Sequence, residues 1–210
     1  MKAILLIFMA MLLADSASAQ VGRLPPRDAC AQDASFRAFR SELEAAVAAK
    51  DADRLLSLTA DDIEFSFGDG AGKADFIANW ELARPRHSAI WAHLAEALRL
   101  GCAPTGDYLG APSMFIDFPE MLDAFEHVVA VGTRIPVHAQ PSADSKLLAR
   151  LDWQILPTLD DEGGDWVKVR LADGRPAYVK RAHVRSPLDY RAIFQKRDDR
   201  WLMTAFVAGD

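Results

Sequence analysis

The side chains that could act as nucleophiles, acids or bases lie between residues 61 and 102. They are Asp61, Asp62, Glu64, His87, His93 and Cys102. A nucleophile needs a base within hydrogen-bond reach and a further group that orients this base, and nothing in the sequence pairs these residues in that way. Asp61 and Asp62 are typical of a junction between a helix and a strand. We therefore expect a protein that is not an enzyme.

Metal ions and cofactors are not expected either. The histidines do not form the close Cys/His cluster of a zinc site; they are His87, His93, His127, His138 and His183. The glycine-rich stretch over residues 68–72 lacks the Lys-Ser/Thr ending of a phosphate-binding loop. We interpret this stretch as a connector.

The start of the chain has the pattern of an export signal. Lys2 precedes an apolar run over residues 3–14, and Ala17-Ser18-Ala19 forms a small-x-small cleavage site. The run is too short to cross a bilayer of about 30 Å as a helix. The sequence predicts a signal peptide over residues 1–19, cleaved after Ala19, and a periplasmic or secreted mature protein without a membrane span. A retained N-terminal anchor is the alternative.

Cys30 and Cys102 are the only cysteines of the sequence. An even number in an oxidising compartment favours a disulfide, which could stabilise the fold by about 4 kcal/mol. Two free buried thiols are the alternative. Because Cys30 precedes the first predicted helix and Cys102 follows the fourth, the disulfide would hold the end of that helix beside the start of the first.

Charge argues against a nucleic-acid partner. The formal net charge is −6, and residues 20–126 hold 10 basic and 18 acidic side chains, compared with 9 and 7 in residues 127–185. No basic stripe of the kind that binds a phosphate backbone is present. The slight positive balance of residues 127–185 would suit an anionic polymer.

Helices are expected to dominate residues 20–126. Apolar residues recur at helical spacing after Asp33, which is a good N-cap, and predict a helix over residues 35–49. Three more helices are predicted, after Asp51, around Phe76 and from Ser88 to Gly101.

Short strands are predicted within this helical region and after it. Residues 62–67 form a half-buried strand, and Met114-Phe115-Ile116 predicts another short one. A short helix is expected over residues 120–125. The last segment, residues 187–210, predicts a β-hairpin, and an isolated hairpin is only marginally stable in water. We therefore expect it to return and complete a small antiparallel sheet with strand 62–67.

Residues 128–186 predict a small β-barrel inserted between the helical region and the hairpin. Short alternating apolar runs are separated by turn residues at close intervals, and Asp173-Gly174 is a strong hairpin signal. The fold class expected is thus α+β: an N-terminal helical region over residues 20–126 with a small antiparallel sheet, and a barrel over residues 127–186.

The barrel region resembles the bacterial SH3-like (SH3b) domain of exported proteins. The matching residues are Val137, Pro141-Ser142, Trp166-Val167-Lys168-Val169, Asp173-Gly174 and Tyr178-Val179. The whole chain is similar to exported proteobacterial proteins that join such a domain to a helical region. The helices, one strand and the final hairpin also resemble the cone fold of the nuclear-transport-factor-2-like family.

Aromatic side chains of the barrel are the candidate ligand-binding residues. They are Trp153, Trp166 and Tyr178, with Asp160 and Asp161 in a neighbouring loop. The SH3-like resemblance implies that such aromatics rim a groove that accepts extended chains. The alternative is that Trp166 and Tyr178 belong to the barrel core.

Three functions follow from these patterns. The first is a non-catalytic exported interaction protein whose barrel binds a cell-envelope polymer such as peptidoglycan, or a peptide segment of an envelope protein. The second is a cone-like pocket in the helical region that binds a small molecule or catalyses a reaction. The third is a structural or assembly role without a separate ligand site.

Overall fold

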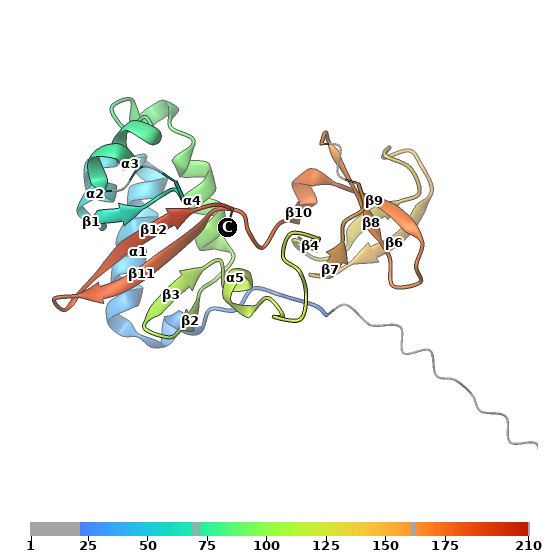
Figure 1. Ribbon diagram of the computed structural model, residues 1–210, viewed down its shortest axis with the longest axis horizontal. Coiled ribbons are helices and arrows are strands. Elements are labelled where there is room, and N and C mark those ends of the chain that lie inside the picture. The colour runs from blue at the N-terminus through green and yellow to red at the C-terminus, as the bar shows by residue number, and fades with distance from the viewer. Residues whose placement is uncertain (1–21, 69, 71, 161–162, 210) are drawn as a thin grey trace, which may run out of the picture.

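The structure, a computed structural model, describes residues 22–68, 70, 72–160 and 163–209. The predicted signal peptide over residues 1–19 lies outside the described residues, as does Asp161. Two units lie side by side (Figure 1). We call residues 22–126 with 188–209 the first unit and residues 127–186 the second unit. None of the described helices is long and apolar enough to cross a membrane.

The α+β class predicted from the sequence is confirmed. The helices are α1 (Ala34–Ala49), α2 (Ala52–Ser57), α3 (Lys73–Asn79), α4 (Ile90–Arg99) and α5 (Ser113–Asp117). The strands of the first unit are β1 (Thr59–Glu64), β2 (Ala103–Thr105), β3 (Tyr108–Ala111), β11 (Arg191–Arg197) and β12 (Arg200–Val207). Those of the second unit are β4 (His127–Ala130), β5 (Ile135–His138), β6 (Leu147–Leu151), β7 (Ile155–Pro157), β8 (Trp166–Arg170), β9 (Pro176–Lys180) and β10 (Val184–Arg185).

The first helices form where the sequence predicts them. The carboxylate of Asp33 accepts hydrogen bonds from the backbone N–H groups of Ser35 and Phe36 and so caps α1, while Asp51 caps α2 in the same way. The apolar stripe of α1 is buried, and α4 buries its own stripe against the same core. These helices cover one face of the sheet (Figure 1).

The C-terminal hairpin lies in the sheet of the first unit. The sheet order is β1-β12-β11-β3-β2, so that β11 and β12 lie at its centre. The pair of β1 and β12 is parallel, whereas the other pairs are antiparallel. The strand predicted over residues 62–67 is displaced by three residues: β1 runs from Thr59 to Glu64. Thr59 and Ala60 are buried in the first unit, whereas Phe67, beyond the end of β1, is 58% exposed.

Two local predictions for residues 112–125 are wrong. The predicted strand Met114-Phe115-Ile116 lies in helix α5, and the predicted helix over residues 120–125 consists of turns. Three apolar residues in a row do not distinguish a strand from a buried helical turn. Ser113 fixes the position of the start of α5. Its hydroxyl accepts a hydrogen bond from the N–H of Arg27 and donates one to the carbonyl of Leu100.

The second unit contains two small sheets around one apolar core. Their orders are β10-β4-β7 and β6-β5-β9-β8, and the shared core includes Val137, Leu156, Val167 and Val179. The described strands do not close into the barrel that the sequence predicts. A single bridge between Thr158 and Val169 joins the sheets on one side, and β6 does not pair with β7 on the other.

An extended N-terminal segment, residues 22–28, connects the two units. In the second unit, Leu24 N–H donates to the Trp153 carbonyl and Ile155 N–H donates to the Gly22 carbonyl. In the first unit, Asp28 forms a parallel bridge with Cys102. The predicted disulfide between Cys30 and Cys102 is present, and it holds the end of α4 beside the start of α1.

Candidate functional site

Trp166 and Tyr178 lie on the same outer face of the four-stranded sheet in the second unit. Val167 and Val169 of β8 point into the core, so the alternate residues Trp166 and Lys168 point outward. The register places Lys168 opposite Tyr178. Both aromatic side chains are half-buried. The structure therefore brings together these two of the residues predicted to bind a ligand.

Lysines alternate with the aromatics on this surface, which we call the aromatic face. Trp166 lies opposite Lys180 across β8 and β9, and the Lys180 ammonium sits 5.8 Å from the centre of the Trp166 ring. His138 packs edge-on against Trp166 with the ring centres 5.5 Å apart. Two aromatic and two cationic side chains thus alternate both along and across β8 and β9.

Asp160 lies beside this face, whereas Trp153 does not. The carboxylate of Asp160 is 3.8 Å from the ammonium of Lys168. Trp153 instead adopts a positive φ of 55° between β6 and β7 and packs against the cluster of Leu24 and Met114 where the two units meet. The structure thus places Trp153 at the junction of the units.

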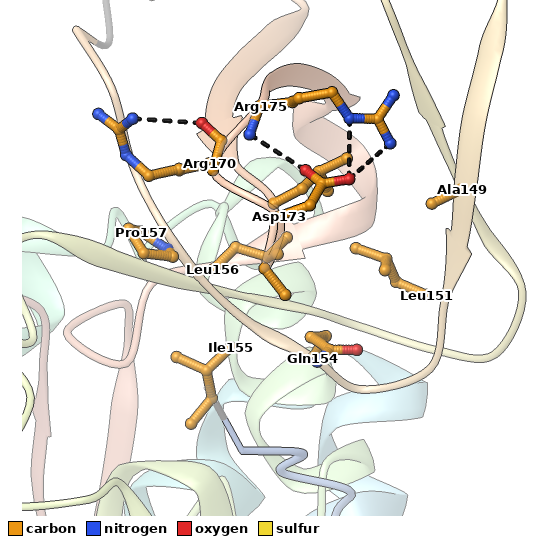
Figure 2. Close-up of a pocket in the computed structure, with 12 residues that line it drawn as sticks. Ala149, Leu151, Gln154, Ile155, Leu156, Pro157, Arg170, Asp173 and Arg175 are labelled. Carbon is orange, nitrogen blue, oxygen red and sulfur yellow. Dashed lines mark hydrogen bonds and ion pairs between the residues drawn. The ribbon is translucent and has the colours of Figure 1, made fainter. Parts of the chain in front are cut away.

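An apolar cavity of about 440 Å³ opens where the two sheets of the second unit fail to join. We call this opening the seam (Figure 2). Its walls are mainly aliphatic side chains from β6, β7 and the hairpin after β8: Ala149, Leu151, Ile155, Leu156 and Leu171. The sequence did not reveal this cavity, because aliphatic residues in alternating strands are indistinguishable from ordinary core residues.

Charged residues of the β8–β9 hairpin form the rim of the seam. The Nε of Arg175 donates to Asp173 at 2.8 Å, and the Arg175 N–H donates to the other carboxylate oxygen at 3.1 Å (Figure 2). The hydrogen bond from the Arg175 side chain holds the pKa of Asp173 below its ordinary value. Arg170 donates to the Gly174 carbonyl, so that the hairpin is fixed as one wall of the cavity.

A second, more polar groove lies on the sheet face of the first unit that the helices leave open. It has a volume of about 330 Å³ and is lined by acidic, basic and aromatic side chains, among them Glu64, Phe67, Tyr108, Phe115 and Arg191. The Arg191 guanidinium lies 4.6 Å from the Phe115 ring centre and 5.5 Å from that of Phe67. At the other end, Arg197 donates to Asp62 at 2.6 Å, which lowers the pKa of Asp62.

The residues considered for catalysis are not assembled into one centre. The Asp61 carboxylate forms an ion pair with the Lys73 ammonium at 2.7 Å. Cys102 is bonded to Cys30 in the disulfide and has no free thiol. His93 is exposed on α4 beside the ring of Tyr190, 4.4 Å away between ring centres. Among the described residues, no group of His, Cys, Asp or Glu has the arrangement needed to hold a metal ion.

Comparison of the chain with protein-family models, with curated proteins and with solved structures found no match.

Proposed function

We propose that this is a non-catalytic, exported interaction protein whose SH3-like second unit binds a cell-envelope polymer of the peptidoglycan type. The observation that supports this proposal best is the aromatic face, on which Trp166 and Tyr178 alternate with Lys168 and Lys180. The export signal predicted over residues 1–19 and the disulfide between Cys30 and Cys102 fit a protein of an oxidising compartment.

The chemistry of the aromatic face suits such a polymer. Indole and phenol rings offer flat apolar surfaces with a polar edge, on which sugar rings can stack. The ammonium groups of Lys168 and Lys180 would attract the carboxylates of the polymer's peptide stems, an attraction that salt weakens. A peptide segment of an envelope protein is the competing ligand for the same face.

A sedimentation assay with purified cell-wall sacculi tests the proposal. The wild-type protein should be retained by the sacculi, and Trp166→Ala combined with Tyr178→Ala should abolish retention. Met121→Ala combined with Phe125→Ala is the matched control, because these two side chains are 91% and 68% exposed and lie outside the second unit. Retention of the double variant at the wild-type level, or no retention of the wild type, contradicts polymer binding.

The polar groove of the first unit supports a second candidate, a small-molecule site. Acidic Glu64 and Asp62 and basic Arg191 line one groove with Tyr108 and Phe115, a combination that suits a zwitterion with an aromatic group such as a free aromatic amino acid. L-phenylalanine should raise the melting temperature of the wild type but not of Glu64→Gln, while Asp75→Asn on exposed α3 serves as control. An unchanged melting temperature at millimolar L-phenylalanine argues against this site.

A further inference from the structure

The seam lies beside an end strand of the second unit whose outer edge is open among the described strands. Strand β6 is the end of its sheet and pairs only with β5 among the described strands, and β7 is the end of the other sheet. The outer edge of an end strand presents unpaired N–H and C=O groups that can accept a further strand. The apolar cavity lies directly inside this edge, since Ala149 and Leu151 of β6 form part of its wall.

The neighbouring strand shows that this part of the molecule accepts an added extended segment. Residues 22–24 pair in antiparallel fashion with the residues at the start of β7, through the bridge of Arg23 with Gln154 and the hydrogen bond from Ile155 to Gly22. Farther along β7, Thr158 bridges Val169 of β8, so the β7 side of the seam is already paired at both ends. The free edge of β6 therefore borders one side of the seam, whose interior is aliphatic.

The charge around β6 indicates which peptide would bind. Lys146 and Arg150 at this edge are exposed, and the Arg150 guanidinium donates to the carbonyl of Arg134, which precedes β5. Strand β6 itself, Leu147–Leu151, contains no acidic residue. The carboxylate of Asp152, just after β6, already pairs with Arg23 at 3.8 Å and accepts a hydrogen bond from the Arg134 N–H. A peptide with acidic residues on its outward side would be attracted to this edge.

We propose that the seam is a second binding site, which takes an extended peptide segment of a partner protein by strand addition to β6. The peptide alternates acidic residues, which face Lys146 and Arg150, with apolar residues, one of which fills the cavity. Main-chain hydrogen bonds to β6 contribute affinity, and the cavity selects the apolar side chain. This site is separate from the aromatic face, because Ala149 and Leu151 line the interior whereas Trp166 and Tyr178 lie on the outer surface.

The probe for this proposal is the acetylated, amidated heptapeptide Glu-Val-Glu-Leu-Glu-Val-Glu, titrated into the full chain with backbone-amide NMR as the readout. We expect shifts in β6 and around Leu156. A version N-methylated at its three central residues cannot pair as a strand and should bind about tenfold more weakly or not at all, since several main-chain hydrogen bonds are lost. The lysine analogue Lys-Val-Lys-Leu-Lys-Val-Lys should also bind more weakly.

Two variants with matched controls test the cavity and the charge. Ala149→Leu fills the cavity and should weaken binding about tenfold, whereas Ala182→Leu on an exposed 3-10 turn should not. Arg150→Glu should weaken binding, whereas Arg200→Glu on the first unit should not. Undiminished binding by the N-methylated peptide or by Ala149→Leu overturns the proposal, as do shifts confined to Trp166 and Tyr178. Loss of sacculus retention in Ala149→Leu would overturn the independence of the two sites.

Discussion

Val129 of β4 lies directly opposite Arg185 of β10 in an antiparallel pair. The chain therefore enters and leaves the second unit at the same place, which makes this unit an insertion into the first. Arg185 also reaches across the boundary, because its guanidinium donates to the carbonyl of Tyr190 just before β11. Its burial lowers the pKa of Arg185, while Asp189 and Glu96 act in the opposite direction.

This insertion predicts the outcome of limited proteolysis. After cleavage near residues 127 and 187, the tail over residues 188–210 should remain bound to the rest of the first unit, because β11 and β12 lie at the centre of its sheet. Size-exclusion chromatography followed by mass spectrometry would detect the tail in the same peak as residues 22–126. A tail fragment that elutes alone under native conditions contradicts the insertion.

Phe194 should be among the residues on which the first unit depends most. It is fully buried (0% exposed), and its ring centre lies 5.3 Å from that of Phe36 and 5.7 Å from that of Phe39. Phe194→Ala should lower the free energy of unfolding by about 3–5 kcal/mol. Phe125→Ala, at a ring that is 68% exposed, should change it by less than about 0.5 kcal/mol. Urea unfolding followed by circular dichroism measures both, and similar values for the two variants would contradict this placement of the core.

The fold elements that were predicted correctly depend on local sequence. The cap at Asp33 and the spacing of Phe36, Phe39 and Leu43 define α1 without reference to any distant residue. Strand partners depend on residues far apart in the chain: the parallel pairing of Thr59 with Met203 follows from how the whole sheet packs on the helices. Alternation along β1 indicates a strand but does not indicate the direction of its neighbour.

Removal of the disulfide should destabilise the first unit selectively. The bond joins residues 72 positions apart, so Cys30→Ala combined with Cys102→Ala should cost about 4 kcal/mol through the added freedom of the unfolded chain. The second unit contains no cysteine, and its own unfolding transition should shift much less. Differential scanning calorimetry of oxidised and variant protein checks this, and a cost below about 1 kcal/mol would contradict it.

Acid should weaken the start of α1 through Asp33. The hydrogen bond from the Ser35 hydroxyl, followed by that from the Phe36 N–H, lowers the pKa of Asp33 below its ordinary value of 3.8. Because the folded pKa is the lower one, the stabilisation is complete above pH 3.8 and is lost as the pH falls through the folded value. The same Ser35 hydroxyl accepts a hydrogen bond from the Trp201 indole at 2.9 Å, so loss of the cap also affects β12.

Two substitutions of Asp33 distinguish the contribution of its capping hydrogen bonds from that of its negative charge. Asp33→Asn keeps a good capping side chain but does not titrate, so its urea midpoint should depend less on pH between 2 and 5 than that of the wild type. Asp33→Ala should lower the midpoint at neutral pH as well. Identical pH profiles for the wild type and Asp33→Asn would show that Asp33 does not contribute in this range.

Gly101 should not tolerate a side chain. Its φ is 78° and an added Cβ would meet the carbonyl group of Arg27, which accepts the hydrogen bond from the Cys102 N–H. Gly101→Ala should destabilise the protein by more than the backbone penalty of about 1–3 kcal/mol, because the carbonyl group of Arg27 must also move. Gly106→Ala is the control, since its φ of 51° carries the same backbone penalty but an added Cβ meets nothing within 4 Å. Equal losses in thermal unfolding would contradict a close approach at Gly101.

Only the part of the candidate site next to a recognisable hairpin turn could be predicted, because such a turn determines which residues of the two strands lie opposite each other. Asp173-Gly174 joins β8 to β9, and alternation from this turn places Trp166 and Tyr178 on one face. Trp153 departs from the prediction because its positive φ turns the chain between β6 and β7, and its side chain packs at the junction. The seam was not predictable, since it results from two sheets that fail to meet.

The strand order of the first unit has a consequence for biosynthesis. The last two strands of the chain, β11 and β12, occupy the middle of its sheet, and β1 has its pairing partner only in β12. Helices α1 and α4 thus keep their apolar faces uncovered until nearly all residues have been translated. These exposed apolar faces need protection from aggregation until the final residues arrive.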